Sequence, residues 1–415
     1  MIGRALEHLR DPSAVARARL TCKAWAASVS NGLTEASLGF AHPYETWSLP
    51  RACPPAWGAR LLSGLTRLDL SIPHLEDTVR IADAPLWSLK HITLRTPLTV
   101  TRSEYWKNVQ SCLTALFASG APLLESLELV NFYITTSDIP SLLAAHATTP
   151  RLSALFMSGC AYRDFDAVSI GVSAIVSLTT LDMSSNGLRC NLSSAPSLTR
   201  LTRLSSLNMS SNHLGAVTGT YAFPDSLTSL DISNNPVTQA IFAALPVSLT
   251  ILKLGDTSVE DGASGALARL TRLTTLNLSE TLVTDAIAAE LPVSLTSLSL
   301  AQNDISTAGV GALARLTRLI LLDISFCSRV DLSSGIRLPR LEMLKASGLS
   351  VESLSAFDGT PSLSNVMVHL QEEGTIDVFI HLHEMYAKSF DNTNWLIEAA
   401  NGHWIDINPD GSFMI

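Results

Sequence analysis

The residues best suited to binding a metal ion lie near the end of the sequence, in a short run that contains His381 and His383. On a strand these two side chains would share one face, and imidazole nitrogens are common zinc ligands. A zinc site needs a third placed protein ligand, and only Asp391 and His403 follow, at irregular spacing. We therefore interpret the histidines as solvated or packing residues and predict no metal site.

The rest of the sequence shows no recognisable catalytic constellation. No glycine-rich nucleotide loop, nucleophile elbow or Cys-x-x-Cys pair is present, and the carboxylates fall singly where solvation explains them. The six cysteines follow no disulfide or metal pattern, and no secretory signal is evident. We predict a non-enzymatic protein without a cofactor. The expected location is the cytoplasm, with the nucleus or the interior of a host cell as alternatives.

Composition narrows the classes of partner. The net charge is −9, whereas a general nucleic-acid-binding protein needs a basic face. Hydrophobic residues make up 47% of the chain, but its apolar runs are too short to cross a membrane. We predict a soluble protein that binds neither nucleic acid nor membrane.

Leucines set the organisation of the chain. Within residues 245–336 one block is written twice, and Leu-Pro-Val-Ser-Leu-Thr opens both copies. Each copy holds two units of the form L-x-x-L-x-L-x-x-(N/T/C), for example Leu295, Leu298, Leu300 and Asn303. The alternation predicts a short strand with buried leucines. The Ala-rich remainder, such as residues 311–316, predicts a helical turn on the outer side.

The polar residue that follows each strand is predicted to point inward and to bond the backbone of neighbouring coils, because unpaired amides there would cost about 1–3 kcal/mol each. Eight residues occupy this position: Asn186, Asn212, Asn235 and Asn303, with Thr257, Thr281, Cys160 and Cys327 as substitutes.

This pattern resembles the leucine-rich repeat. The resemblance implies an α/β solenoid, in which a curved parallel β-sheet is backed by short convex helices. We assign residues 65–370 to the repeats, 41–64 to a connector and 1–40 to a helical segment. Residues 371–415 are predicted to form a C-terminal cap, with a meander of strands at 394–399, 403–407 and 412–415 separated by strong turn sequences.

Residues 1–40 differ in kind from the repeats. Asp11-Pro12 separates two amphipathic helices, and the second contains Leu20-Thr21-Cys22-Lys23-Ala24-Trp25. This segment resembles the greater part of an F-box, and the resemblance implies docking on a Skp-type adaptor through Leu6, Leu9, Pro12, Cys22 and Trp25. The opening Leu-Pro of that family is absent. We expect either a truncated start or weakened adaptor binding.

Two other interpretations of residues 1–40 stay open. Repeat proteins need a cap on the open apolar end of the first repeat, and an amphipathic segment would serve. An Arg-rich and Ala-rich transit peptide is the other alternative, which Glu7, Asp11 and Pro12 disfavour.

Together the two regions resemble F-box/leucine-rich-repeat proteins, and the Gly-Ala-Leu-Ala runs resemble the GALA-type repeats of bacterial effectors. The resemblance implies the substrate receptor of an SCF-type cullin-RING ubiquitin ligase, whose repeats bind an unknown target protein. The alternative is a repeat scaffold or effector that binds a partner protein without any role in ubiquitylation.

The face of the predicted sheet carries mostly Ser and Thr. These side chains bind a partner weakly, because the binding energy of protein interfaces is concentrated in aromatic residues and arginine. Two regions break this monotony and are our candidate partner-binding sites. The early one comprises Lys90, His91, Arg95, Glu128 and Phe156, and the late one Ile320, Leu321, Phe326 and Met343. An apolar patch of this kind attracts a partner, unless a flanking cap covers it.

Overall fold

The computed structural model of the 415-residue chain describes residues 35–38, 66–71, 88–95, 123–131, 151–160, 171–189, 195–215, 222–237, 239–331, 338–348, 363–369, 394–398, 404–407 and 413–414. The chain divides into two compact units, Met1–Asn186 and Gly187–Ile415. Both units are built from the same kind of parallel coil. Of the predicted N-terminal helical segment, the described residues include only 35–38.

In the first unit each strand pairs in parallel with the next one along the chain. The strands are β1 (Glu35–Leu38), β2 (Arg67–Ser71), β3 (His91–Arg95), β4 (Ser126–Val130), β5 (Ala154–Ser158) and β6 (Thr180–Asp182). The sequence places the first repeat strand after residue 64, and the structure adds β1 before it. Burial alternates along β3, β4 and β5, as the leucine spacing predicts.

In the second unit the parallel pairing runs without interruption from β7 to β15. The strands are β7 (Ser206–Asn208), β8 (Ser229–Asp231), β9 (Ile251–Lys253), β10 (Thr275–Asn277), β11 (Ser297–Ser299), β12 (Leu321–Asp323), β13 (Met343–Lys345), β14 (Asn365–His369) and β15 (Asn394–Glu398). Two antiparallel strands follow, β16 (Trp404–Ile407) and β17 (Phe413–Met414). The predicted C-terminal meander is confirmed, and β15 joins it to the repeat sheet.

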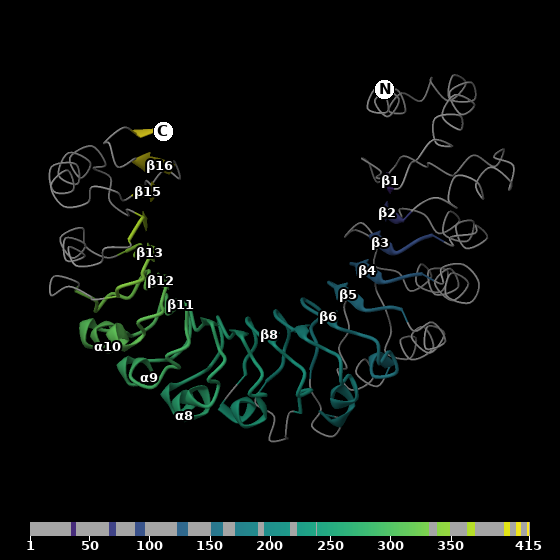
Figure 1. The fold of residues 1–415 in the computed structure, drawn as a ribbon, viewed down its shortest axis with the longest axis horizontal. Helices are drawn as coiled ribbons and strands as arrows, with labels where there is room; N and C mark the ends of the chain where they lie inside the picture. Colours follow the sequence, from purple (N-terminus) through teal and green to yellow (C-terminus); the bar gives the residue numbers. More distant parts are fainter. Residues whose placement is uncertain are drawn as a thin grey trace, which may run out of the picture. The chain divides into compact units, whose positions relative to one another are not determined.

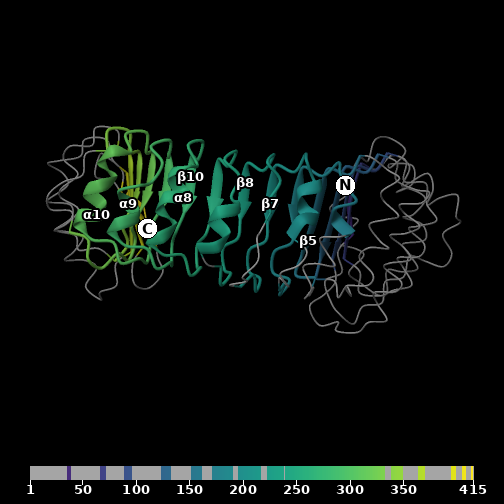
Figure 2. The ribbon, with the colours of Figure 1, turned by 90° about the horizontal axis from the view of Figure 1, so that it is seen from below.

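Short helices of the second unit lie on the side away from the sheet, where α8, α9 and α10 follow one another coil by coil (Figures 1 and 2). The helices are α8 (Ser264–Ala268), α9 (Asp285–Ala288) and α10 (Thr307–Ala312), with 3-10 turns η3 (Ala195–Arg200), η4 (Gln239–Ala244), η5 (Asp261–Ala263) and η6 (Leu313–Arg315). Strand, turn and outer helical segment recur in the coils of β9 to β12 and confirm the predicted solenoid.

The inward polar residues form the ladder that the sequence predicts. The Asn303 amide donates to the carbonyls of Leu300 in its own coil, at 3.0 Å, and of Leu278 in the preceding coil. Its carbonyl accepts from the backbone N–H of Thr281 at 3.1 Å. All eight ladder residues are buried. The asparagines supply polar atoms to the turn of the preceding coil, whereas the hydroxyls of Thr257 and Thr281 donate to carbonyls of their own coil.

The recurrent Ser-Leu-Thr triplet also joins the coils, which the sequence did not indicate. Ser294 donates its hydroxyl to the Leu273 carbonyl at 2.6 Å, and Thr296 donates to the Thr274 carbonyl at 3.1 Å. The same bonds recur at Ser226 and Ser248, and at Thr228, Thr250 and Thr274. Short hydroxyl residues expected only to face solvent therefore bind the preceding coil.

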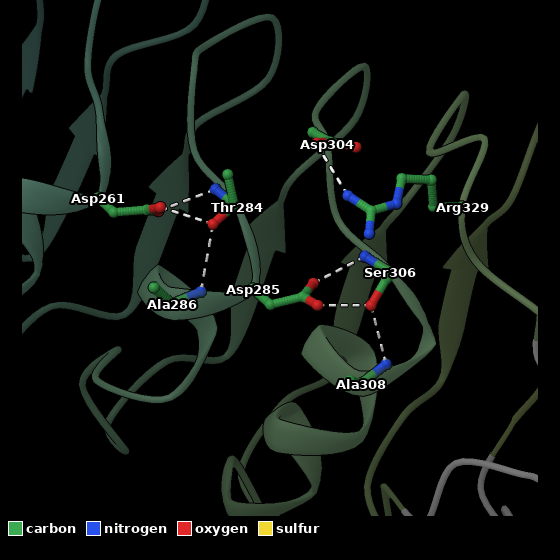
Figure 3. Close-up of polar contacts among 8 residues, drawn as sticks. All are labelled: Asp261, Thr284, Asp285, Ala286, Asp304, Ser306, Ala308 and Arg329. Carbon is green, nitrogen blue, oxygen red and sulfur yellow. Dashed lines mark hydrogen bonds and ion pairs between the residues drawn. The ribbon is translucent and has the colours of Figure 1, made fainter.

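The helix side carries a second ladder, shown in Figure 3. The Asp261 carboxylate accepts from the backbone N–H (2.8 Å) and hydroxyl (2.6 Å) of Thr284, the N-cap of α9. Asp285 accepts in the same way from Ser306, the N-cap of α10. This capping starts α10 at Thr307, four residues before the helical turn expected at 311–316, whose later part is the 3-10 turn η6.

Two arginines bond carbonyls in the helical segment of the preceding coil, which is η4 for Arg269 and the end of α9 for Arg315. Arg269 donates to the Phe242 carbonyl at 2.9 Å and Arg315 to the Ala288 carbonyl at 3.2 Å, each reaching back into the preceding coil. Burial lowers the pKa of the Arg315 guanidinium, and the nearby Glu290 carboxylate opposes this change. The Ala-Arg-Leu of the repeat is thus a helix cap for its neighbour.

Candidate partner-binding surface

The predicted adaptor-binding residues Leu6, Leu9, Pro12, Cys22 and Trp25 lie outside the described part of the chain. The predicted partner-binding residues all lie within it. Those from Lys90 to Phe156 belong to the first unit, and those from Ile320 to Met343 belong to the second.

In the first unit the centre of the candidate site is Glu128 on β4. Its carboxylate accepts from Thr93 Oγ1 at 2.9 Å and forms an ion pair with Arg95 at 3.5 Å. His91 lies on the same face, two positions before Thr93 on β3. Lys90 precedes the strand and pairs with Glu125 at 3.2 Å. Arg95 is thus paired with Glu128 inside the patch and Lys90 with Glu125 outside it, at half-exposed sites where each pair contributes little stability.

Phe156 completes the early patch. In the strand register it stands between Glu128 on one side and Asp182 on the other, and it is half-buried. The structure therefore brings together His91, Arg95, Glu128 and Phe156 on one face, with an aromatic ring between two carboxylates.

In the second unit the late patch separates into two parts. Leu321 and Met343 are register neighbours on β12 and β13, and Ile320, which is 40% exposed, directly precedes Leu321. Phe326 lies beyond the end of β12, in the turn that follows Asp323. Asp323 and Lys345 lie between them on the face. The four residues thus occupy two adjoining places, the strands and the turn after β12, and their role in binding stays a prediction.

Phe326 has an unusual backbone. Its φ is 58°, in the left-handed region, and its side chain is 39% exposed. Other coils of this unit place Ser, Asn, Asp, Glu or Gln at the same point, at Ser211, Asn234, Asp256, Glu280 and Gln302. The ring lies against Gly348 in the next coil, where a Cβ would stand 2.6 Å from Phe326 Cδ1. A bulky residue in this conformation is strained, and such strain favours a functional role.

A group of acids and amides on the sheet face turns out to be structural. Asp323 Oδ1 accepts from the backbone N–H of Ser325 at 3.1 Å, which closes the turn after β12. Asp182, Asn208, Asp231 and Asn277 make the same bond to the residue two positions on. At the same register position of β3 to β14, the described residues that are neither Asp nor Asn are Thr93, Glu128, Phe156, Lys253, Ser299, Lys345 and Met367. A residue other than Asp or Asn at this position is therefore a signal that marks a candidate binding position.

Lys253 and Ile251 are face residues that the sequence analysis missed. Both occupy β9, and the Lys253 ammonium pairs with Asp231 of the preceding strand at 3.3 Å. Their signal is the Ile-Leu-Lys sequence, which stands where neighbouring coils carry Ser-Leu-Asp and Thr-Leu-Asn.

The described residues contain neither a metal-binding cluster nor a membrane-spanning helix. No group of three His, Cys, Asp or Glu side chains there could hold a metal ion, and His381 and His383 lie outside these residues. Within the same ranges no helix is long and apolar enough to cross a membrane.

Comparisons with known proteins agree on the repeat. A family model described as Leucine Rich repeat matches residues 293–314. The sequence has no significant match among curated proteins. An internalin (InlF) from Listeria monocytogenes is similar in structure, with 18% sequence identity, a TM-score of 0.50, and coverage of 75% of this chain and 82% of that chain.

Two further solved structures are more distant. The functional domain of InlJ from Listeria monocytogenes is 16% identical, with a TM-score of 0.45 and coverage of 82% of this chain and 65% of that chain. The leucine-rich repeat domain of APL1 is 20% identical, with a TM-score of 0.45 and coverage of 81% and 85%. Together the internalin likeness, the repeat match and the stacked parallel coils define this chain as a leucine-rich-repeat solenoid.

Proposed function

We propose that this protein is a non-catalytic receptor that binds another protein on the sheet face of its repeats. The observation that carries the proposal is Phe326, an aromatic side chain 39% exposed at a backbone angle that disfavours it. Aromatic residues are common anchors of protein interfaces. Ile320, Leu321 and Met343 add apolar surface on the adjoining part of the same face.

We further propose that residues 1–40 couple this receptor to a Skp-type adaptor, as a substrate-recognition subunit of an SCF-type ubiquitin ligase. The support is the F-box-like sequence, in which Leu6, Leu9, Pro12, Cys22 and Trp25 would contact the adaptor. The repeats would then present the bound target to the ligase.

Co-purification with a Skp-type adaptor tests the ligase proposal. The full chain is expected to retain the adaptor, and a Leu9→Ala/Trp25→Ala variant with an unchanged circular dichroism spectrum is expected to lose it. Failure of the wild-type chain to retain adaptor would sink the ligase role. The protein would then be a repeat scaffold or effector that binds its partner without ubiquitylation.

The binding face is tested separately with Leu321→Ser/Met343→Ser and Phe326→Asn variants of the full chain. Proteins that the wild type captures from cell extract should be lost from these variants and kept by Ser229→Ala, a matched change on β8 of the same sheet. Equal capture by all variants would place the binding surface elsewhere.

A further inference from the structure

The residues that directly precede the strands of the second unit form a basic edge in an acidic protein. The strand register is constant from β7 to β13, so the residue just before the first core leucine of each coil recurs in one row. This row contains four exposed arginines, which we name the arginine edge: Arg203, Arg272, Arg318 and Arg340. Among the described residues, none of the four makes an ion pair.

The other coils place Ser at this position. Ser226, Ser248 and Ser294 are occupied in bonding the carbonyls of the preceding coil. The serines therefore have a role within the solenoid, whereas the exposed arginines at the same position make no ion pair with another described residue and are available to a ligand.

Exposed valines alternate with the arginines. Val247 and Val293 lie two residues before the core leucine of their coils, and each is 60% exposed. In coil order the edge reads Val247, Arg272, Val293, Arg318. Neighbouring strands are about 4.8 Å apart, so the two arginines, like the two valines, are separated by about 10 Å.

Carboxylates are concentrated at the other end of the strands. Asp256, Glu280 and Asp304 are exposed in the turns that follow β9, β10 and β11. On the arginine edge itself the exposed carboxylates next to the strands are Asp225 and Glu342. The net charge of −9 makes a row of unpaired arginines a local feature that attracts anions to this edge.

We propose that the arginine edge binds an extended, acidic segment of a protein partner, in which apolar residues alternate with carboxylates. Arginine pairs with carboxylate through two parallel hydrogen bonds. A polyproline II segment repeats every third residue at about 9.3 Å, which matches the spacing along the edge. The inference rests on the proposal that the repeats bind a protein.

The chemistry of the edge favours a polypeptide over a nucleic acid. Phosphates follow one another at about 3.4 Å along a strand of DNA, and single-stranded nucleic acids are held by stacking on aromatic rings. The edge instead presents valines between its arginines, which suit aliphatic side chains.

Fluorescence anisotropy with the full chain tests this proposal. The probe is a fluorescein-labelled peptide of five Glu-Pro-Leu repeats, and the expected result is saturable binding that weakens with salt. Arg272→Gln/Arg318→Gln should weaken binding about tenfold. The matched control Arg189→Gln/Arg329→Gln removes two exposed arginines away from this edge and should leave the affinity within about twofold. Val247→Ser/Val293→Ser should weaken binding without changing its salt dependence.

Several results would overturn the proposal. One is no binding of the Glu-Pro-Leu peptide, or equal loss in the edge and control variants. Another is tighter binding of a fifteen-residue oligothymidylate, or of phosphatidylserine vesicles, than of the peptide. Adaptor retention is measured with changes in residues 1–40, so failure of the peptide assay leaves that test unaffected. Failure to retain the adaptor likewise leaves the peptide assay unaffected.

Discussion

The Asp285 carboxylate holds both the backbone N–H and the hydroxyl of Ser306, the residue that caps α10 in the next coil (Figure 3). Ser306 in turn accepts from the Ala308 N–H at 3.2 Å. One side chain therefore fixes the start of a helix in a different repeat, and the helix side of the solenoid is stabilised from coil to coil.

Gly309 makes this contact possible, because a Cβ there would overlap the Asp285 carboxylate. We expect Gly309→Ala to lower the free energy of unfolding by about 1–3 kcal/mol through displacement of this ladder. Gly311→Ala is the matched control in the same helix, where a Cβ would meet nothing within 4 Å. That change should be neutral or stabilising by up to about 1 kcal/mol. Denaturant unfolding measures both, and equal values for the two variants would refute the packing argument.

The Asn303 side chain is predicted to stabilise the turn in which it lies. Asn303→Leu should lower the free energy of unfolding by about 1–3 kcal/mol, because the Thr281 N–H loses its side-chain acceptor and the Leu278 and Leu300 carbonyls each lose a donor. Thermal unfolding followed by circular dichroism is the measurement, with Ser299→Ala on the adjacent strand as the control. A neutral Asn303→Leu variant would show that these amides find other partners.

Phe326→Asn should separate stability from binding. Asn accepts a left-handed backbone more readily than Phe, so relief of strain should offset the lost contact with Gly348. We expect a change in the free energy of unfolding of less than about 1 kcal/mol, together with loss of the captured partner. Strong destabilisation with binding retained would instead make Phe326 a packing residue.

Cys327 should make stability fall in alkaline solution. Burial raises the pKa of its thiol above the ordinary 9.0, with Asp323 adding to the rise and backbone hydrogen bonds near Asn303 opposing it. Because the folded pKa is the higher one, the full contribution is present below pH 9.0 and is lost as the pH rises toward the folded pKa.

The difference between wild type and Cys327→Ala isolates this effect from other alkaline titrations. The wild type should lose up to about 1.4 kcal/mol more per pH unit above the unfolded pKa. Chemical denaturation at a series of pH values above and below 9.0 gives the comparison. Parallel pH profiles for the two proteins would contradict the assignment.

The sequence predicted the architecture because the same leucine pattern recurs in each repeat. Leu295, Leu298 and Leu300 can be buried together only on one side of a short strand, and the same argument applies at each recurrence. The inward position of Asn303 followed from the same spacing. The C-terminal meander was predictable for a different reason, because strong turn sequences separate its strands.

What the sequence could not determine depends on contacts between coils. Ser294 and Thr296 look like solvated surface residues until the preceding coil places a carbonyl within reach of each hydroxyl. Asp285 looks like an isolated acid until Ser306 is brought beside it. Ile320 and Phe326 look like neighbours on one patch, but Ile320 precedes β12 and Phe326 lies in the turn that follows it.

The arginine edge shows both contributions. The sequence alone determined that Arg272 and Arg318 occupy equivalent points of a repeat. Only the tertiary structure decided that these points align in register and are exposed, with valines between them. Periodicity along a chain specifies which side chains are equivalent, whereas their distances depend on the spacing of stacked strands, which is a property of the folded backbone.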